Sequence, residues 1–122
     1  MNFKTIQHFK ESEFECKCGC GLNIIDESLV LQLDIARSMS RVPFVINSAC
    51  RCIAHNKAVG GLADSAHLKG LAVDIKVAND EERHEIVRNL IFFGGFKRVL
   101  LYPSFVHVDI DYTKPYPILK IM

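Results

Sequence analysis

Residues 65–75 read SAHLKGLAVDI, and the second half of this stretch decides how the chain folds. From Leu71 onward, larger aliphatic residues alternate with small or polar ones, and this period of two predicts a β-strand over residues 71–77. Asp74 lies inside the apolar run. Because a buried carboxylate without a partner costs several kcal/mol, the sequence predicts that a cation, a metal ion or water at an open edge compensates Asp74.

The strand alternation places Asp74 on the polar face of a sheet rather than in the core. Residues 105–111 alternate in the same way, with aliphatic residues on one side and His107 and Asp109 on the other. If the two strands are neighbours, Asp74 and His107 lie within a few ångströms of each other. One face of the sheet is then expected to bury the helices, and the opposite face to carry a site.

Two segments have the apolar spacing of helices. Residues 26–39 place an apolar stripe at the helical period and begin with Asp26, a candidate N-cap. Residues 79–95 begin with Asn79 and Glu82, which resemble a capping box, and end in two glycines that stop a helix. The sequence therefore predicts two helices on one face of the sheet.

The other segments predict two further strands and long irregular connections. Strands are expected over residues 44–48 and 97–103, the latter joined to the next strand by a tight turn at Pro103–Ser104. Residues 51–70 are expected to form a polar, Gly-rich loop, and the tail after Tyr112 to be irregular. The predicted fold class is α+β, with a mainly antiparallel sheet.

Composition limits the classes of function. With 122 residues, 49% of them hydrophobic, residues 1–122 are expected to form one domain with an ample core. The net charge of +1 gives no reason to expect nucleic acid or a membrane surface as a partner. We see no apolar segment of a signal peptide and no run of about 20 apolar residues. We therefore expect a monomer that is synthesised in the cytoplasm.

Five cysteines occur in two clusters, ECKCGCG with Cys16, Cys18 and Cys20, and ACRC with Cys50 and Cys52. An odd number cannot pair completely within one chain. Three uses remain open: buried or free thiols, a disulfide, and a metal site made of thiolates. The lack of a secretory signal counts against disulfides, and the spacing C-x-C, rather than C-x2-C, makes the metal signal weak.

His67, Asp74 and His107 form a plausible catalytic zinc set, because such sites use three protein ligands and leave a fourth position for water. The spacing alone is not specific. A loop histidine, an exposed strand carboxylate and a histidine on the sheet surface are the structural alternative.

Two motifs carry a family resemblance. The segment INSACRCIAHNKAVGGLADSAHLKGLAVDI, followed by FVHVDI, resembles the zinc D-alanyl-D-alanine carboxypeptidase family, which includes phage endolysins and is related in fold to hedgehog signalling domains. The resemblance extends from His8 to Asp111, and its most specific element is S-x-H-x2-G-x-A-x-D. It implies a hedgehog-like fold, one zinc ion per chain and peptidoglycan stem peptides as the substrate.

The resemblance also implies roles for single residues. The zinc ligands it implies are His67, Asp74 and His107. Arg51, in the S-x-x-R segment, matches an arginine that binds or polarises substrate. Two further candidates come from their position in the loop and not from the resemblance. Ser65 is a candidate for orienting His67 or contacting substrate, with capping of the loop as the structural alternative. His55 is a candidate for lining the cleft, with a surface histidine as the alternative.

The chain departs from the family pattern at the general base. Many members carry an acid three residues before the last zinc histidine, where this chain has Ser104. Hedgehog-like and related sites often carry a histidine two residues before it, where this chain has Phe105. The nearest substitute is Asp109, on the same sheet face as His107. Two roles remain open for Asp109: a catalytic base acting through water, or a carboxylate that orients a ligand histidine.

The leading hypothesis is a zinc metallopeptidase that acts at the bacterial cell wall, as a D-Ala-D-Ala carboxypeptidase or an L-Ala-D-Glu endopeptidase of the phage-lysin type. The alternative is a non-catalytic, zinc-containing module that binds peptides or partners, as hedgehog-like domains do. A third hypothesis is a cysteine-rich domain whose metal site is the thiol cluster.

Overall fold

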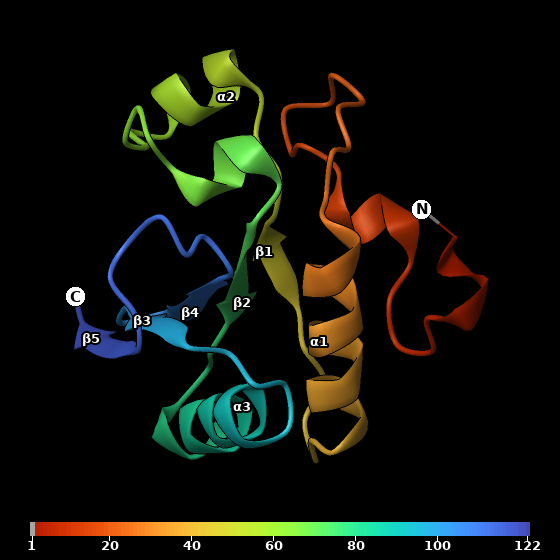
Figure 1. Ribbon diagram of the computed structural model, residues 1–122, viewed down its shortest axis with the longest axis vertical. Coiled ribbons are helices and arrows are strands. Elements are labelled where there is room, and N and C mark those ends of the chain that lie inside the picture. Colours follow the sequence, from red (N-terminus) through yellow and green to blue (C-terminus); the bar gives the residue numbers. More distant parts are fainter. Residues whose placement is uncertain (1) are drawn as a thin grey trace.

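A five-stranded sheet forms the centre of the protein (Figure 1). The structure, a computed structural model, describes residues 2–122. The strands lie in the spatial order β1-β2-β4-β3-β5. Their bounds are β1 (Ile46–Ser48), β2 (Ala72–Lys76), β3 (Arg98–Leu101), β4 (Phe105–Asp109) and β5 (Ile118–Ile121). The pairs β1–β2, β2–β4 and β4–β3 are antiparallel, whereas β3 and β5 are parallel.

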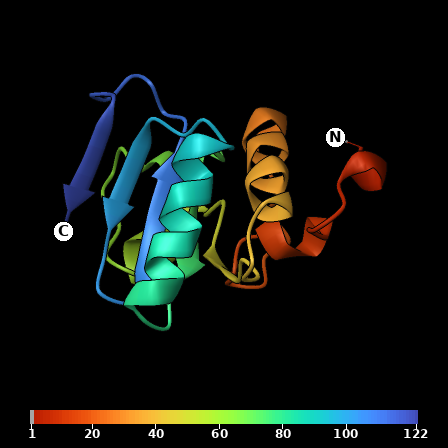
Figure 2. The same ribbon diagram turned by 90° about the horizontal axis from the view of Figure 1, so that it is seen from below.

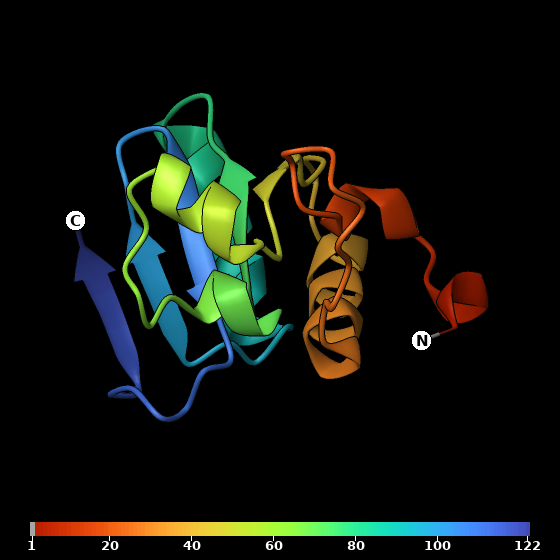
Figure 3. The same ribbon diagram turned by 90° about the horizontal axis from the view of Figure 1, so that it is seen from above.

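Helices cover both faces of this sheet. The longer helices are α1 (Glu27–Ser38) and α3 (Asp80–Phe92). Seen from below, α3 lies over the sheet with α1 beside it (Figure 2). Seen from above, the short helix α2 (Ile53–Ala58) and the 3-10 turn η3 (Ala66–Lys69) lie over the opposite face (Figure 3). Two further 3-10 turns, η1 (Phe3–Thr5) and η2 (Glu11–Phe14), precede α1.

The main core lies between the sheet and the two longer helices. The strands contribute the aliphatic half of their alternating pattern, and α1 and α3 contribute their apolar stripes. All of the following side chains are buried in this core: Leu29, Leu33, Val73, Ile75, Ile86, Leu90, Val106 and Val108. Each such side chain contributes about 1.5–3 kcal/mol when it is fully buried. The opposite face of β2 and β4 is thereby left to the polar half of the pattern.

Both longer helices begin at the predicted caps. Asp26 Oδ1 accepts a hydrogen bond from the backbone N–H of Ser28 at 2.8 Å, and Asn79 Oδ1 accepts one from Glu82 N at 2.8 Å. These side chains satisfy backbone donors that have no partner inside the helix. The caps therefore fix the residue at which each helix starts.

The fold class α+β is as predicted, but the sheet is mixed and not mainly antiparallel. The tail after Tyr112, predicted to be irregular, forms the parallel edge strand β5. Its ILKI sequence is too short to show a clear period, Pro117 directly precedes it, and Pro115 lies two residues before Pro117.

The polar loop predicted over residues 51–70 contains α2 and η3. Each of these elements is shorter than two helical turns, so neither shows a helical period in the sequence. No helix within residues 2–122 combines the length and apolar character that a membrane span requires.

Candidate active site

Strands β2 and β4 place Asp74 directly opposite His107 in the antiparallel register. His107 Nδ1 lies 2.9 Å from Asp74 Oδ1. His67, at the end of the polar segment before β2, brings its Nε2 to 3.2 Å from the same oxygen. The two imidazole rings meet edge to face with centroids 5.2 Å apart. The structure therefore brings together the three residues predicted to be zinc ligands.

The ring of His67 is oriented by a backbone carbonyl, and the turn η3 that carries it is fixed at both ends. Its Nδ1 lies 2.6 Å from the carbonyl oxygen of Ala49, so the Nδ1–H donates and the lone pair of Nε2 faces Asp74. Ser65 Oγ accepts from the N–H of His67 at 3.2 Å and caps η3. At the other end, Gly70 has φ 69°, and a Cβ there would meet Ile24 O at 2.1 Å. Only glycine lets η3 close against this carbonyl.

His107 is held by a second carboxylate. Its Nε2 lies 2.7 Å from Asp109 Oδ2. Asp109 Oδ1 accepts from Arg98 Nε at 2.7 Å and from Asp111 N at 3.0 Å. Asp109 is 1% exposed and both of its oxygens are engaged. This geometry favours the orienting role for Asp109, because the carboxylate keeps the proton on Nε2 and turns Nδ1 of His107 toward Asp74.

Three acceptor groups therefore point at one another: Nε2 of His67, Nδ1 of His107 and the carboxylate of Asp74. A tetrahedral zinc ion with bonds of about 2.0–2.1 Å holds its ligand atoms about 3.3 Å apart. The separations of 3.2 and 2.9 Å to Asp74 Oδ1 are close to this value. The donor set thus fits a zinc ion.

The charge of Asp74 also suits a cation. Asp74 is 6% exposed. Burial by itself would raise the pKa of its carboxyl. When no metal ion is bound, N–H donation and positive charge from protonated imidazoles at His107 and His67 hold that pKa well below its usual range. Asp74 is therefore ionised at neutral pH, as a metal ligand must be.

Arg51 lies beside this centre and is held by its neighbours. Its Nε donates to Ser48 Oγ at 3.1 Å and its Nη1 to Asn56 Oδ1 at 3.2 Å. Its Nη2 lies 3.5 Å from Asp74 Oδ2. A Cβ at Gly61 would lie 2.0 Å from Asn56 Oδ1, so the absence of a side chain at Gly61 leaves room for the amide that holds the guanidinium.

The side chains of His67, Asp74 and His107 line a cleft of about 590 Å³. Arg51 and Ser65 line this cleft. His55 lies on α2 and is not among the residues that line the cleft, so the structure does not bring it to the site. One wall is formed by Tyr102 and Phe105, whose rings stack with centroids 4.3 Å apart.

Arg98, which joins β3 to the site through Asp109, was not among the residues predicted from the sequence. The sequence nevertheless contained a pattern that predicts its partner. The predicted two-residue turn at Pro103–Ser104 sets the register of the hairpin, and counting outward from this turn places Arg98 opposite Asp109, as observed. A cation in an apolar strand, facing a carboxylate across the ladder, could have been recognised as a buried pair.

Two histidines and an aspartate on one face of an α+β sheet, beside a fixed arginine in an open cleft, define the class of site as a metallohydrolase centre. The profile of the family described as Peptidase M15 matches residues 7–109, and the chain belongs to this family of metallopeptidases. This match confirms the resemblance to the zinc D-alanyl-D-alanine carboxypeptidase type. A search of the curated proteins found no match.

Proposed function

We propose that the protein is a zinc peptidase that hydrolyses peptide bonds in peptidoglycan stem peptides, with D-Ala-D-Ala carboxypeptidase or L-Ala-D-Glu endopeptidase activity. The observation that carries this proposal is the convergence of three fixed acceptor groups beside Arg51 at the base of the cleft. Membership of the Peptidase M15 family supports it. The site of action would be the bacterial cell wall, as for a phage-type lysin.

In this proposal, one zinc ion is held by His67 Nε2, Asp74 and His107 Nδ1. The chemistry that zinc supplies in such a site is polarisation of the scissile carbonyl and a lowered pKa of a coordinated water. Asp109 and the carbonyl of Ala49 orient the two imidazoles, so that the ligand geometry is set before substrate arrives.

Arg51 would bind the carbonyl or carboxylate oxygens of the substrate. Its guanidinium lines the cleft and already has partners on Nε and Nη1, which fix its plane. A planar, preorganised cation is suited to stabilising the negative charge that develops on the carbonyl oxygen.

The cleft also offers cations farther from the centre. Lys114 and Lys120 line it, together with Arg51. Arg98, a fourth cation of the lining, is paired with Asp109, and the acids Asp64 and Asp74 also line the cleft. Peptidoglycan stem peptides carry free carboxylates, which Arg51, Lys114 and Lys120 would attract. This charge pattern supports an anionic peptide as the substrate.

Arg51→Lys is expected to lower kcat/KM at least about tenfold, equivalent to about 1.4 kcal/mol of transition-state stabilisation. Lysine keeps the charge but loses the two-pronged donor geometry and the bond to Asn56. Steady-state kinetics on a stem-peptide substrate measure the effect. Kinetics equal to those of the unaltered protein would remove Arg51 from the mechanism.

Digestion of purified peptidoglycan tests the proposed function. Mass spectrometry of the fragments should show released D-Ala for a carboxypeptidase, or cleavage between L-Ala and D-Glu for an endopeptidase. A zinc chelator should abolish the release, and zinc added back should restore it.

A binding module is the second candidate, because the two usual base positions are Ser104 and Phe105 and Asp109 is fully engaged. In that case the digest would release no fragments from peptidoglycan, while the zinc-loaded protein would still bind it in a sedimentation assay.

A further inference from the structure

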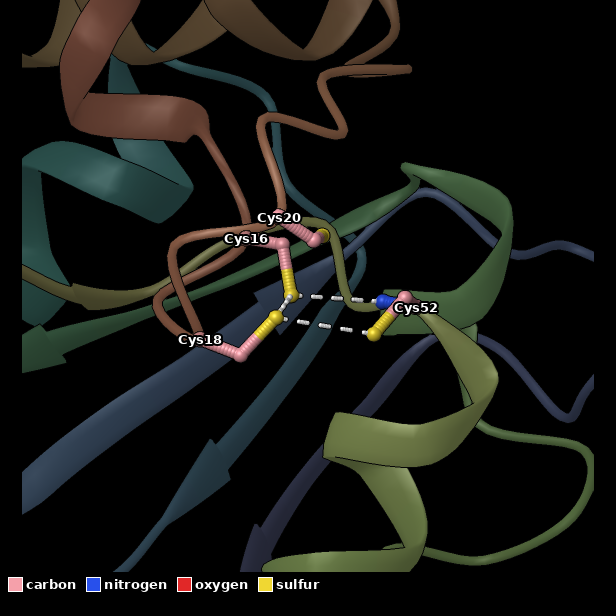
Figure 4. Close-up of side chains that lie close together, drawn as sticks. All are labelled: Cys16, Cys18, Cys20 and Cys52. Carbon is pink, nitrogen blue, oxygen red and sulfur yellow. Dashed lines mark hydrogen bonds between the residues drawn. The ribbon is translucent and has the colours of Figure 1, made fainter.

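The two cysteine clusters of the sequence meet in space (Figure 4). Cys16, Cys18 and Cys20 lie on the loop between η2 and α1, and Cys52 is the N-cap of α2. All four sulfur atoms lie within 4.8 Å of one another. Cys16 Sγ is 3.4 Å from Cys18 Sγ, which is 3.7 Å from Cys52 Sγ.

These separations suit a metal ion better than a disulfide. A zinc ion with four Zn–S bonds of about 2.3 Å holds its sulfur atoms about 3.8 Å apart, whereas bonded sulfurs lie about 2.0 Å apart. Within residues 2–122 all five cysteines are free thiols. Cys18 and Cys20 are exposed, so burial of small apolar side chains does not explain why these sulfurs gather.

The backbone of the loop is shaped to bring the thiols together. Gly19 and Gly21 have φ of 84° and 82°, a conformation that residues with a side chain rarely adopt. The N–H of Cys16 donates to Leu22 O at 2.8 Å and closes the loop at its base. Gly19 and Gly21 therefore turn the chain so that the three cysteines of the loop, at alternate positions, face one point.

Backbone donors also point at the sulfurs. Cys52 N–H donates to Cys16 Sγ at 3.4 Å, and His55 N–H donates to Cys52 Sγ at 3.3 Å. Hydrogen bonds from backbone amides stabilise the negative charge of thiolate ligands. The two hydrogen bonds would therefore stabilise thiolates at Cys16 and Cys52.

The fifth cysteine has a different environment. Cys50 is buried, and its Sγ donates to the carbonyl oxygen of Phe14 at 3.0 Å. It is not part of the four-sulfur group. The odd cysteine count thus divides into four that converge and one that packs in the interior.

We propose that Cys16, Cys18, Cys20 and Cys52 bind one zinc ion in a closed, tetrahedral structural site, separate from the histidine and aspartate centre. Four thiolates fill the coordination sphere of zinc and leave no position for water, which is typical of structural sites. Soft thiolate ligands favour zinc over magnesium or calcium.

This second metal site would stabilise the segment that carries Arg51 at the cleft. Cys52 directly follows Arg51, whose backbone N–H donates to His67 O at 3.0 Å. A metal bound to Cys52 would tie this segment to the N-terminal loop. The proposal does not depend on the peptidase activity, because its measurements count and characterise bound metal.

Metal content per chain tests the proposal on the purified protein, loaded with zinc under reducing conditions. Native mass spectrometry should find two zinc ions. The double variant Cys18→Ala/Cys20→Ala removes two exposed ligands without opening a core cavity, and it should retain one. His67→Ala should also retain one, and Cys50→Ser is the matched control that should retain two.

X-ray absorption at the zinc edge gives a second measurement that needs no variant. The unaltered protein should show a Zn–S shell at about 2.3 Å together with a Zn–N/O shell at about 2.0–2.1 Å. The double cysteine variant should lose the sulfur shell, and His67→Ala should keep it.

A spectrum of the loaded protein without a sulfur shell would overturn the proposal, as would a double cysteine variant that binds as much zinc as the unaltered protein. Iron in place of zinc would overturn the assignment of the metal. Failure of the peptidoglycan digest would leave these metal measurements unchanged, so the two proposals are tested separately.

Discussion

His67→Ala is expected to lose the zinc of the cleft and to lower kcat/KM on stem peptides by at least about 10³-fold. The removed Nε2 is one of three acceptors that face one another, and Asp74 and His107 alone leave the ligand set incomplete. Metal-ion catalysis contributes several kcal/mol, and each 1.36 kcal/mol corresponds to a factor of ten in rate. Metal analysis and kinetics on the same sample measure both effects.

The same result is expected for His107→Ala. The matched control is His84→Ala, which replaces an exposed histidine on α3, a helix that packs on the opposite face of the sheet from the cleft. This control should keep both the metal content and the activity. If His67→Ala or His107→Ala retains the full zinc content of the unaltered protein, the ligand assignment is wrong.

Asp109→Asn is expected to weaken zinc binding by about 10–100-fold, the usual effect of removing a group that orients a metal ligand. The asparagine carbonyl can accept from Arg98 or from the Nε2–H of His107, but its amide nitrogen cannot serve as the second acceptor. Zinc titration against a competing chelator measures the affinity.

The same substitution is expected to lower the free energy of unfolding of the metal-free protein by about 3–5 kcal/mol. It removes the charged partner of Arg98, whose side chain is 7% exposed, and a buried cation without its carboxylate is strongly destabilising. Urea unfolding measures the change. Asp80→Asn is the control, because the Asp80 side chain in its ion pair with Arg83 is 92% exposed and such pairs contribute about 0–1 kcal/mol.

The catalytic-base role predicts a different outcome for Asp109→Asn. Zinc affinity would then be unchanged and kcat would fall by about 10²–10⁴-fold. If neither metal affinity nor turnover changed, both roles would be refuted for Asp109. The base would then be sought at Asp64, an exposed acid that lines the cleft.

Local sequence patterns were sufficient to predict the part of the site that lies on strands. The alternation in residues 71–77 and 105–111 put Asp74 and His107 on the face opposite the core, and the structure places them directly opposite each other. The tight turn at Pro103–Ser104 likewise determines the strand register that pairs Arg98 with Asp109. A strand has a side-chain period of two, so a few residues determine which face each side chain occupies.

Tertiary structure alone decided how the loops complete the site. Cys16 and Cys52 are 36 residues apart and meet through a backbone hydrogen bond to sulfur, and His67 is oriented by the carbonyl of Ala49, 18 residues away. The short helix α2 and the edge strand β5 also had no readable pattern in the sequence. Such contacts depend on how the packed strands and helices bring distant loops together, and no local period records that geometry.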